Sequence, residues 1–162
     1  MVGVDGSEAG FEALRQARRL LARSGRLMAA IAVEERFAVH AGMSAPKVLD
    51  DLRTEAEATR QAAGELVAGL DNAETVVASG RPSEVLRSVA EREEADLIAV
   101  GTHGTSRPVG FLIGSVATTM LNESPCTVLI ARAAGAEFPS TRRFARRRQP
   151  RAPRHPCAGQ RQ

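Results

Sequence analysis

Glycine and hydroxyl residues with the spacing of a phosphate-binding loop follow a short apolar run that ends at Val100. Gly101 and Gly104 come directly after this run, and nine residues separate Gly104 from Gly114 and Ser115, where a helical pattern begins. Glycines at the carboxyl end of a strand let the backbone turn sharply and approach a ligand closely. The unpaired N–H groups of a helix N-terminus, joined by a serine hydroxyl, can bind phosphate oxygens. We therefore predict a phosphate site here.

Two other phosphate motifs are missing from the sequence. The P-loop pattern GxxxxGK[ST] is absent, and the chain has a single lysine, Lys47. No GxGxxG follows the first apolar run, where the sequence reads VGVDGSEAG. Neither a P-loop ATPase nor a classical dinucleotide-binding fold is therefore supported.

Four polar residues near these glycines each allow two interpretations. Asp5 follows the first apolar run, where it could contact a ligand or form a turn. Thr102 could give phosphate a hydroxyl donor or be a polar loop residue. His103 is expected to be a loop residue, because no carboxylate or nucleophile has a spacing that partners it for acid–base catalysis. Arg81 could meet phosphate charge, but a solvated surface arginine is the simpler interpretation.

Short strand-like runs alternate with longer helical patterns over residues 1–132. We expect strands at residues 1–4, 27–33, 74–78, 97–100 and 127–131, and helices that begin at Ser7, Ser44, Pro82 and Ser115. Gly25 is expected to cap the carboxyl end of the first helix. Strand–helix alternation predicts an α/β fold of three layers, a parallel sheet with helices on both faces.

Composition limits the class of protein. The 162 residues are 43% hydrophobic and 25% charged, which is typical of a globular domain with its own core. The longest apolar run, Leu27–Val33, is far shorter than the ~20 residues that a membrane-spanning helix needs. No secretory leader is visible in the first twenty residues, and two cysteines with three scattered histidines form no metal-binding pattern. We expect a cytoplasmic protein without a resident metal or a membrane association.

Charge divides the chain into two parts. Residues 1–132 hold 14 basic and 18 acidic residues, a net charge of −4. Residues 133–162 hold eight arginines and one acid, a net charge of +7, together with half of the eight prolines. We predict one domain at 1–132 and a disordered Arg/Pro-rich tail at 133–162. The tail is either an inert extension or an electrostatic arm for RNA, DNA or anionic lipid.

The motif from Gly101 to Val116 resembles the G-x2-G-x9-G-[ST] nucleotide signature of the universal stress protein family. The opening from Val2 to Ser7, the Gly80–Pro82 segment and the Pro125–Ile130 segment are also similar to that family. The resemblance covers about residues 1–132, and the tail has no counterpart in it. The family's first strand usually begins several residues before the position of Met1, so we expect a shortened central strand and an earlier start of the natural chain.

The resemblance implies a sheet of five parallel strands in the order 3-2-1-4-5 and a place in the branch of the family that binds ATP. By position, Asp5 would contact adenine or ribose, and Val33 would lie beside the adenine. The residues implied to hold ribose and phosphates are Gly101, Thr102, Gly104, Gly114, Ser115 and Val116. The resemblance also implies a homodimer paired through the edge strand at Cys126–Ala131, since an apolar edge strand needs covering.

The expected function is that of an ATP-binding regulatory module in the stress response. ATP could bring one Mg²⁺ ion of its own, but no set of residues is placed to hold two metal ions and position water, so hydrolysis would be slow at most. One alternative is an ATP-using α/β enzyme of the adenylating or ATP pyrophosphatase type. Asp5, Gly6 and Ser7 are only weakly similar to the phosphate loop that follows the first strand of such enzymes. Another is nucleic-acid binding through the tail.

Overall fold

The computed structural model describes residues 1–34, 45–104 and 113–133 of the chain. Its helices and strands, in chain order, are β1 (Val2–Gly3), α1 (Glu8–Leu20), β2 (Leu27–Val33), α3 (Ala45–Val67), β3 (Ala73–Ser79), α4 (Pro82–Arg92), β4 (Leu97–Gly101), α5 (Ser115–Glu123) and β5 (Thr127–Ala131). Each strand expected from the sequence is present. The tail expected to be disordered lies outside the described residues from 134 onward.

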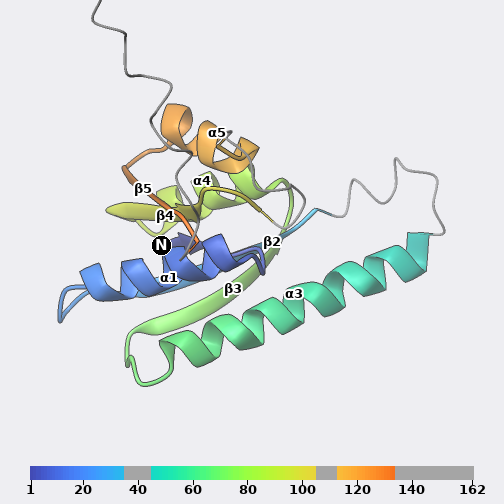
Figure 1. Ribbon diagram of the computed structural model, residues 1–162, viewed down its shortest axis with the longest axis horizontal. Coiled ribbons are helices and arrows are strands. Elements are labelled where there is room, and N and C mark those ends of the chain that lie inside the picture. The colour runs from blue at the N-terminus through green and yellow to red at the C-terminus, as the bar shows by residue number, and fades with distance from the viewer. Residues whose placement is uncertain (35–44, 105–112, 134–162) are drawn as a thin grey trace, which may run out of the picture.

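The five strands form one parallel sheet in the order β3-β2-β1-β4-β5. Helices α1 and α3 cover one face of the sheet, and α4 and α5 cover the other (Figure 1). This arrangement confirms the predicted α/β fold and its strand order. Connections from β1 and β4 lead in opposite directions across the sheet, so a crevice opens at the carboxyl ends of these two neighbouring strands.

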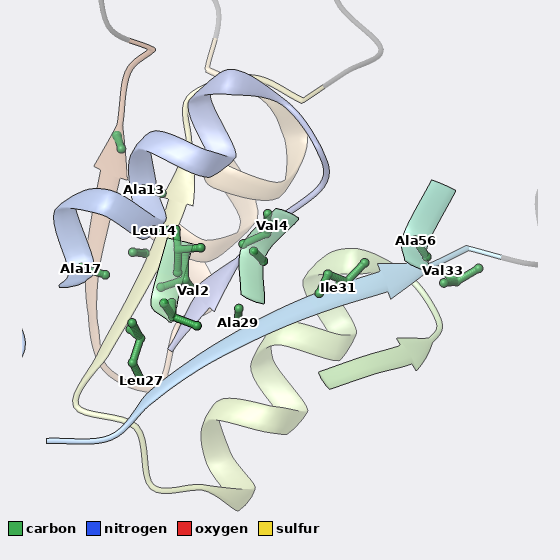
Figure 2. Close-up of a cluster of buried hydrophobic side chains, with 14 residues drawn as sticks. Val2, Val4, Ala13, Leu14, Ala17, Leu27, Ala29, Ile31, Val33 and Ala56 are labelled. Atoms are coloured by element: carbon green, nitrogen blue, oxygen red, sulfur yellow. The ribbon is translucent and has the colours of Figure 1, made fainter. Parts of the chain in front are cut away.

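Strand β2 shows how the apolar runs build the core. All seven residues of Leu27–Val33 are apolar, and six of them are buried. Successive side chains point to opposite faces, so Ala29, Ile31 and Val33 join the core beneath α1 and α3. Figure 2 shows these side chains together with those of the neighbouring core residues. Ala30 belongs instead to the core beneath α4 and α5, and a strand buried on both faces needs such a continuous apolar run.

Helix α1 begins as the sequence predicted and ends differently. The Ser7 hydroxyl accepts the Gly10 N–H at 3.1 Å, which confirms Ser7 as the N-cap. The predicted cap at Gly25 is wrong, because the helix ends at Leu20 and Leu21 already has extended backbone. The Leu21 side chain packs against the core, which draws the chain out of the helix early. Gly25 lies in a turn beyond it, where its N–H donates to the Ala22 carbonyl at 2.9 Å.

The central strand is the shortest of the sheet. β1 has two residues and pairs with β2 on one side and with β4 on the other, whereas β2 and β3 pair over seven residues. Two further bonds extend this ladder slightly: Val4 N–H to the Ala30 carbonyl at 3.0 Å, and Ala99 N–H to the Met1 carbonyl at 2.9 Å. The expected shortening of this strand is thus confirmed. No helix in the described part of the chain is both long and apolar enough to cross a membrane.

Candidate functional site

A cavity of about 470 Å³ opens at the carboxyl edge of the sheet, over the short strand β1. Its floor comes from β1, β2 and β4, and its two side walls come from the first turns of α4 and α5. The residues on the α4 side are Ala30, Ala32, Glu34, Arg81, Pro82, Ser83 and Leu86. Those on the α5 side are Val100, Gly101, His103, Gly104, Gly114, Ser115, Val116, Ala117 and Thr119, and Gly3, Val4 and Asp5 lie between them.

The cavity lies at the point where the direction of winding reverses, as ligand sites do in open α/β sheets. The N-termini of α4 and α5 both line it, and a helix N-terminus carries unpaired N–H groups and a partial positive charge. An anionic group held between them would meet both dipoles. The arrangement therefore suits a small molecule with at least one anionic part.

Asp5 is held in place by the first turn that follows β1. Its Oδ1 accepts the Ser7 hydroxyl at 2.6 Å and the Ser7 N–H at 3.1 Å. The same hydroxyl lies 3.2 Å from the His103 carbonyl oxygen, which joins the turn after β1 to the loop after β4. The two interpretations of Asp5 are thus compatible, because the residue forms a turn and also lines the cavity.

Gly104 lies directly against this carboxylate. A Cβ placed on Gly104 would come within 2.6 Å of Asp5 Oδ2. Any side chain here would displace the Asp5 carboxylate or push the loop away from it. The glycine therefore permits the close contact between the loop and Asp5.

Gly101 has a different reason to be glycine. A Cβ there would lie 2.7 Å from the Ala9 carbonyl carbon and 2.8 Å from the Gly10 nitrogen, both backbone atoms of α1. The end of β4 thus packs directly on the first turn of α1. Gly101 lines the cavity, and it also fixes the distance between the sheet and the helix.

Gly114 and the residues after it form the start of α5. The Gly114 N–H donates to the Thr102 carbonyl at 2.7 Å, and the Gly114 carbonyl accepts the Thr118 N–H at 2.9 Å. The N-cap is a glycine, so it offers no side-chain acceptor to the N–H groups of the first turn. Ser115 and Val116 follow at the cavity wall, and their contacts with ribose and phosphates remain predictions.

Two of the expected site residues do not line the cavity. Thr102 is buried beside it, with its N–H donating to the Ala131 carbonyl at 2.7 Å and its Oγ1 lying 3.1 Å from His103 Nδ1. Val33 is buried in the core beneath α1 and α3, and its carbonyl accepts the Gly80 N–H at 3.0 Å. In β2 it is Ala32, on the opposite face, that reaches the cavity. Direct ligand contacts by Thr102 and Val33 remain predictions.

The α4 side of the cavity has a weaker sequence signal than the α5 side. Arg81 was expected to be a solvated arginine, and Glu34, Ser83 and Thr119 were not singled out. The available signal was Pro82, because proline favours the first position of a helix. A helix that starts just after a strand places its N-terminus at the same sheet edge as the glycines after β4. Within the described residues, no group of three or more His, Cys, Asp or Glu side chains could hold a metal ion.

The sheet order and the cavity at its carboxyl edge define a doubly wound α/β protein. Residues 1–132 match the model of the universal stress protein family, so the chain belongs to that family. This finding confirms the family resemblance noted in the sequence.

Relatives of known sequence carry the same family description. A universal stress protein from Staphylococcus saprophyticus is 38% identical over 66 residues, which is 40% of this chain and 40% of that protein. A universal stress protein from Thermus aquaticus is 34% identical over 64 residues, which is 40% of this chain and 47% of that protein. The matched segments thus span less than half the length of these relatives.

Solved structures resemble the whole folded part of the chain. UspA from Lactobacillus plantarum, a universal stress protein, is 26% identical and superposes with a TM-score of 0.69, over 81% of this chain and 94% of that one. A universal stress protein solved in complex with cAMP is 28% identical with a TM-score of 0.52, over 82% and 94% of the two chains. Both similarities support the strand order described above.

Proposed function

We propose that this chain binds a nucleotide, ATP, in the cavity over β1 and serves as a regulatory module in the stress response. One observation carries the proposal. The loop after β4 and the first turn of α5, with Gly104, Gly114 and Ser115, form one wall of a cavity that also holds Asp5. Backbone N–H groups on the wall would bind phosphate oxygens, and the Asp5 carboxylate would accept hydrogen bonds from ribose hydroxyls or from the base.

The size and lining of the cavity support a ligand of this class. Small-molecule sites commonly enclose about 300–1,000 Å³ and combine apolar walls with a few polar groups, and this cavity encloses about 470 Å³. Glycines and hydroxyl residues gather on the α5 side, whereas the floor on the α4 side is formed by Ala30, Ala32 and Leu86. Phosphates would therefore lie at α5, and the base would lie toward α4.

The carboxylates at the cavity favour binding over rapid turnover. Efficient phosphoryl transfer needs metal ions and a positioned nucleophile. Among the described lining residues the only carboxylates are Asp5 and Glu34, and Asp5 is held by Ser7. Mg²⁺ would arrive with the ATP, and the bound nucleotide would set the state of the module. The complex with cAMP was solved for the neighbouring protein and not for this chain. It makes cAMP a useful competitor to test.

ATP is expected to raise the thermal unfolding midpoint of this protein. A ligand that binds only the folded state at 100 times its Kd adds about 2.7 kcal/mol of stability. The measurement is differential scanning calorimetry with increasing ATP and Mg²⁺, with ADP, GTP and cAMP in parallel. A midpoint that stays constant at millimolar ATP would remove the proposed ligand, and a larger shift with cAMP than with ATP would replace it.

We also propose a homodimer that pairs through strand β5. β5 lies at one edge of the sheet and β3 at the other. The Thr102 N–H donates to the Ala131 carbonyl, so the polar backbone groups of Ala131 face β4. These groups alternate in direction along a strand, and those of Ile130 therefore face away from β4, at an edge that no other strand of the described residues pairs with. An exposed edge of this kind is a template for pairing with a second copy.

Ile130→Pro is expected to give a monomer, because it removes an outward N–H at this edge. The matched control is Val77→Pro on the opposite edge strand. There the Gly80 N–H donates to the Val33 carbonyl, so the backbone of Val77, three residues earlier, points outward. Sedimentation equilibrium should show dimers for the native protein and the control. Dimers that persist in Ile130→Pro and disappear in Val77→Pro would assign the interface to β3.

A further inference from the structure

The base end of the cavity lacks the flat partner that a nucleobase usually finds. The described residues that line it include no Phe, Tyr or Trp, and its one aromatic ring, the His103 imidazole, is on the α5 side; the chain has neither tryptophan nor tyrosine. The floor at this end is apolar: the Leu86 side chain lies over Gly3, and Ala30 and Ala32 are the small side chains beside it. A planar ring lying on this floor needs another cover on its opposite face, because base stacking adds considerably to nucleotide affinity.

Arg81 is placed to provide that cover. It lines the cavity at the residue before α4, where its backbone is extended (φ −65°, ψ 133°) as the position before Pro82 requires. Its side chain is 64% exposed, and its ion pair with Glu84 is long, at 3.7 Å between exposed groups. A pair of this kind contributes little, so the guanidinium can leave it readily for a ligand.

The Arg81 side chain also has the chemistry for this role. A guanidinium is planar and weakly hydrated, and it stacks on aromatic faces, whereas a lysine ammonium is a strongly hydrated point charge. The Arg81 side chain makes no hydrogen bond that caps α4, so the start of the helix does not depend on such a bond. We propose that the Arg81 guanidinium stacks on the nucleobase and holds it against the apolar floor formed by Ala30, Ala32 and Leu86. This inference depends on the proposed function, since it concerns the same ligand.

The position of Arg81 separates this role from phosphate binding. Arg81 stands on the α4 side of the cavity, and α4 packs over β2, whereas α5 packs over β4 and β5. Gly104, Gly114 and Ser115 are on the far side of β1 from β2. A ligand whose phosphates occupy the start of α5 thus presents its base to Arg81.

The experiment compares the binding of ATP with the binding of its nucleoside part and of its phosphate part. Isothermal titration calorimetry, in competition mode for weak ligands, measures ATP, adenosine and tripolyphosphate with native protein, Arg81→Ala, Arg81→Lys and Arg87→Ala. Arg87 is the matched control, because it lies in α4, the helix that Arg81 precedes, is not among the residues that line the cavity and pairs with Glu123 at 3.9 Å. The unfolding midpoints without ligand verify that each variant is folded.

Stacking predicts that Arg81→Ala weakens ATP and adenosine by the same factor, about five- to tenfold, and leaves tripolyphosphate unchanged. Arg81→Lys should recover little of the loss, and Arg87→Ala should match the native protein. The proposal is overturned if Arg81→Ala leaves ATP affinity unchanged. It is also overturned if tripolyphosphate weakens as much as ATP and lysine restores both, since Arg81 would then bind phosphate. Native protein that binds no ATP would instead refute the proposed function itself.

Discussion

Gly114→Val is expected to abolish measurable ATP binding while the protein remains folded. Gly114 is the N-cap of α5, and its side-chain position faces the loop after β4. A branched side chain there would stand beside the N–H groups that the proposal assigns to the phosphates. Hydrogen bonds to a charged group contribute about 1.5–3 kcal/mol each, so the loss of two lowers affinity by at least about 100-fold.

The cost of Gly114→Val to folding is expected to be small. Gly114 has extended backbone (φ −60°, ψ 159°), which valine adopts without strain. Its added Cβ would lie 3.2 Å from the Thr102 carbonyl oxygen, so the loop must move by only a few tenths of an ångström. We expect a loss of about 1 kcal/mol in the free energy of unfolding.

Two further variants make the Gly114 experiment specific. Ser115→Ala removes one hydroxyl from the cavity wall and should weaken ATP by about tenfold. Thr118→Val, on an exposed position of α5 outside the cavity, should leave affinity unchanged. Calorimetry gives all three values. Unchanged affinity in Gly114→Val would make the glycine a simple turn residue, and the assignment of a nucleotide to this cavity would fall with it.

Gly101→Ala is expected to destabilise the protein more than Gly114→Val does, although it adds only one methyl group. The new Cβ would overlap with backbone atoms of Ala9 and Gly10, at 2.7 and 2.8 Å. Backbone cannot rotate away as a flexible side chain does, so α1 must move off β4. Overpacking of this kind costs about 1–3 kcal/mol, and we expect the upper end of that range in urea unfolding.

The matched control is Gly64→Ala in helix α3. Apart from the neighbouring backbone of α3, no atom of the described residues lies within 4 Å of the position that its Cβ would take, and alanine is favoured over glycine in a helix by roughly 0.5–1 kcal/mol. The same chemical change should therefore stabilise the protein at position 64 and destabilise it at position 101. Equal urea midpoints for Gly101→Ala and the native protein would show that α1 does not rest on the end of β4 as closely as described.

The fold could be predicted because its signals are local. Apolar runs such as Leu27–Val33 mark buried parallel strands, and Ser7 and Pro82 mark helix starts. The end of α1 could not be placed at Leu20, because it depends on the contact of Leu21 with the core. That contact exists only once the sheet has formed.

The candidate site was predicted on one side and missed on the other. The Gly101–Ser115 motif keeps its members close in the chain, so their spacing reveals them. Asp5 also lines the cavity. The α4 wall joins residues that are distant in sequence, and a periodic pattern does not reveal which face of β2 meets the cavity. Val33 and Ala32 are neighbours in the chain, yet only Ala32 reaches the cavity.

The short central strand has a consequence for how the chain folds during synthesis. β1 leaves the ribosome first, but its partner β4 begins only at Leu97. At about 5–20 residues per second, β1 waits roughly 5–20 seconds before both of its neighbours exist. A two-residue strand holds few backbone bonds to β2 alone, so the middle of the sheet stays open until β4 has emerged. Until β4 emerges, the nascent chain exposes apolar strand edges, and chains that terminate before Leu97 should be recognised by chaperones instead of folding.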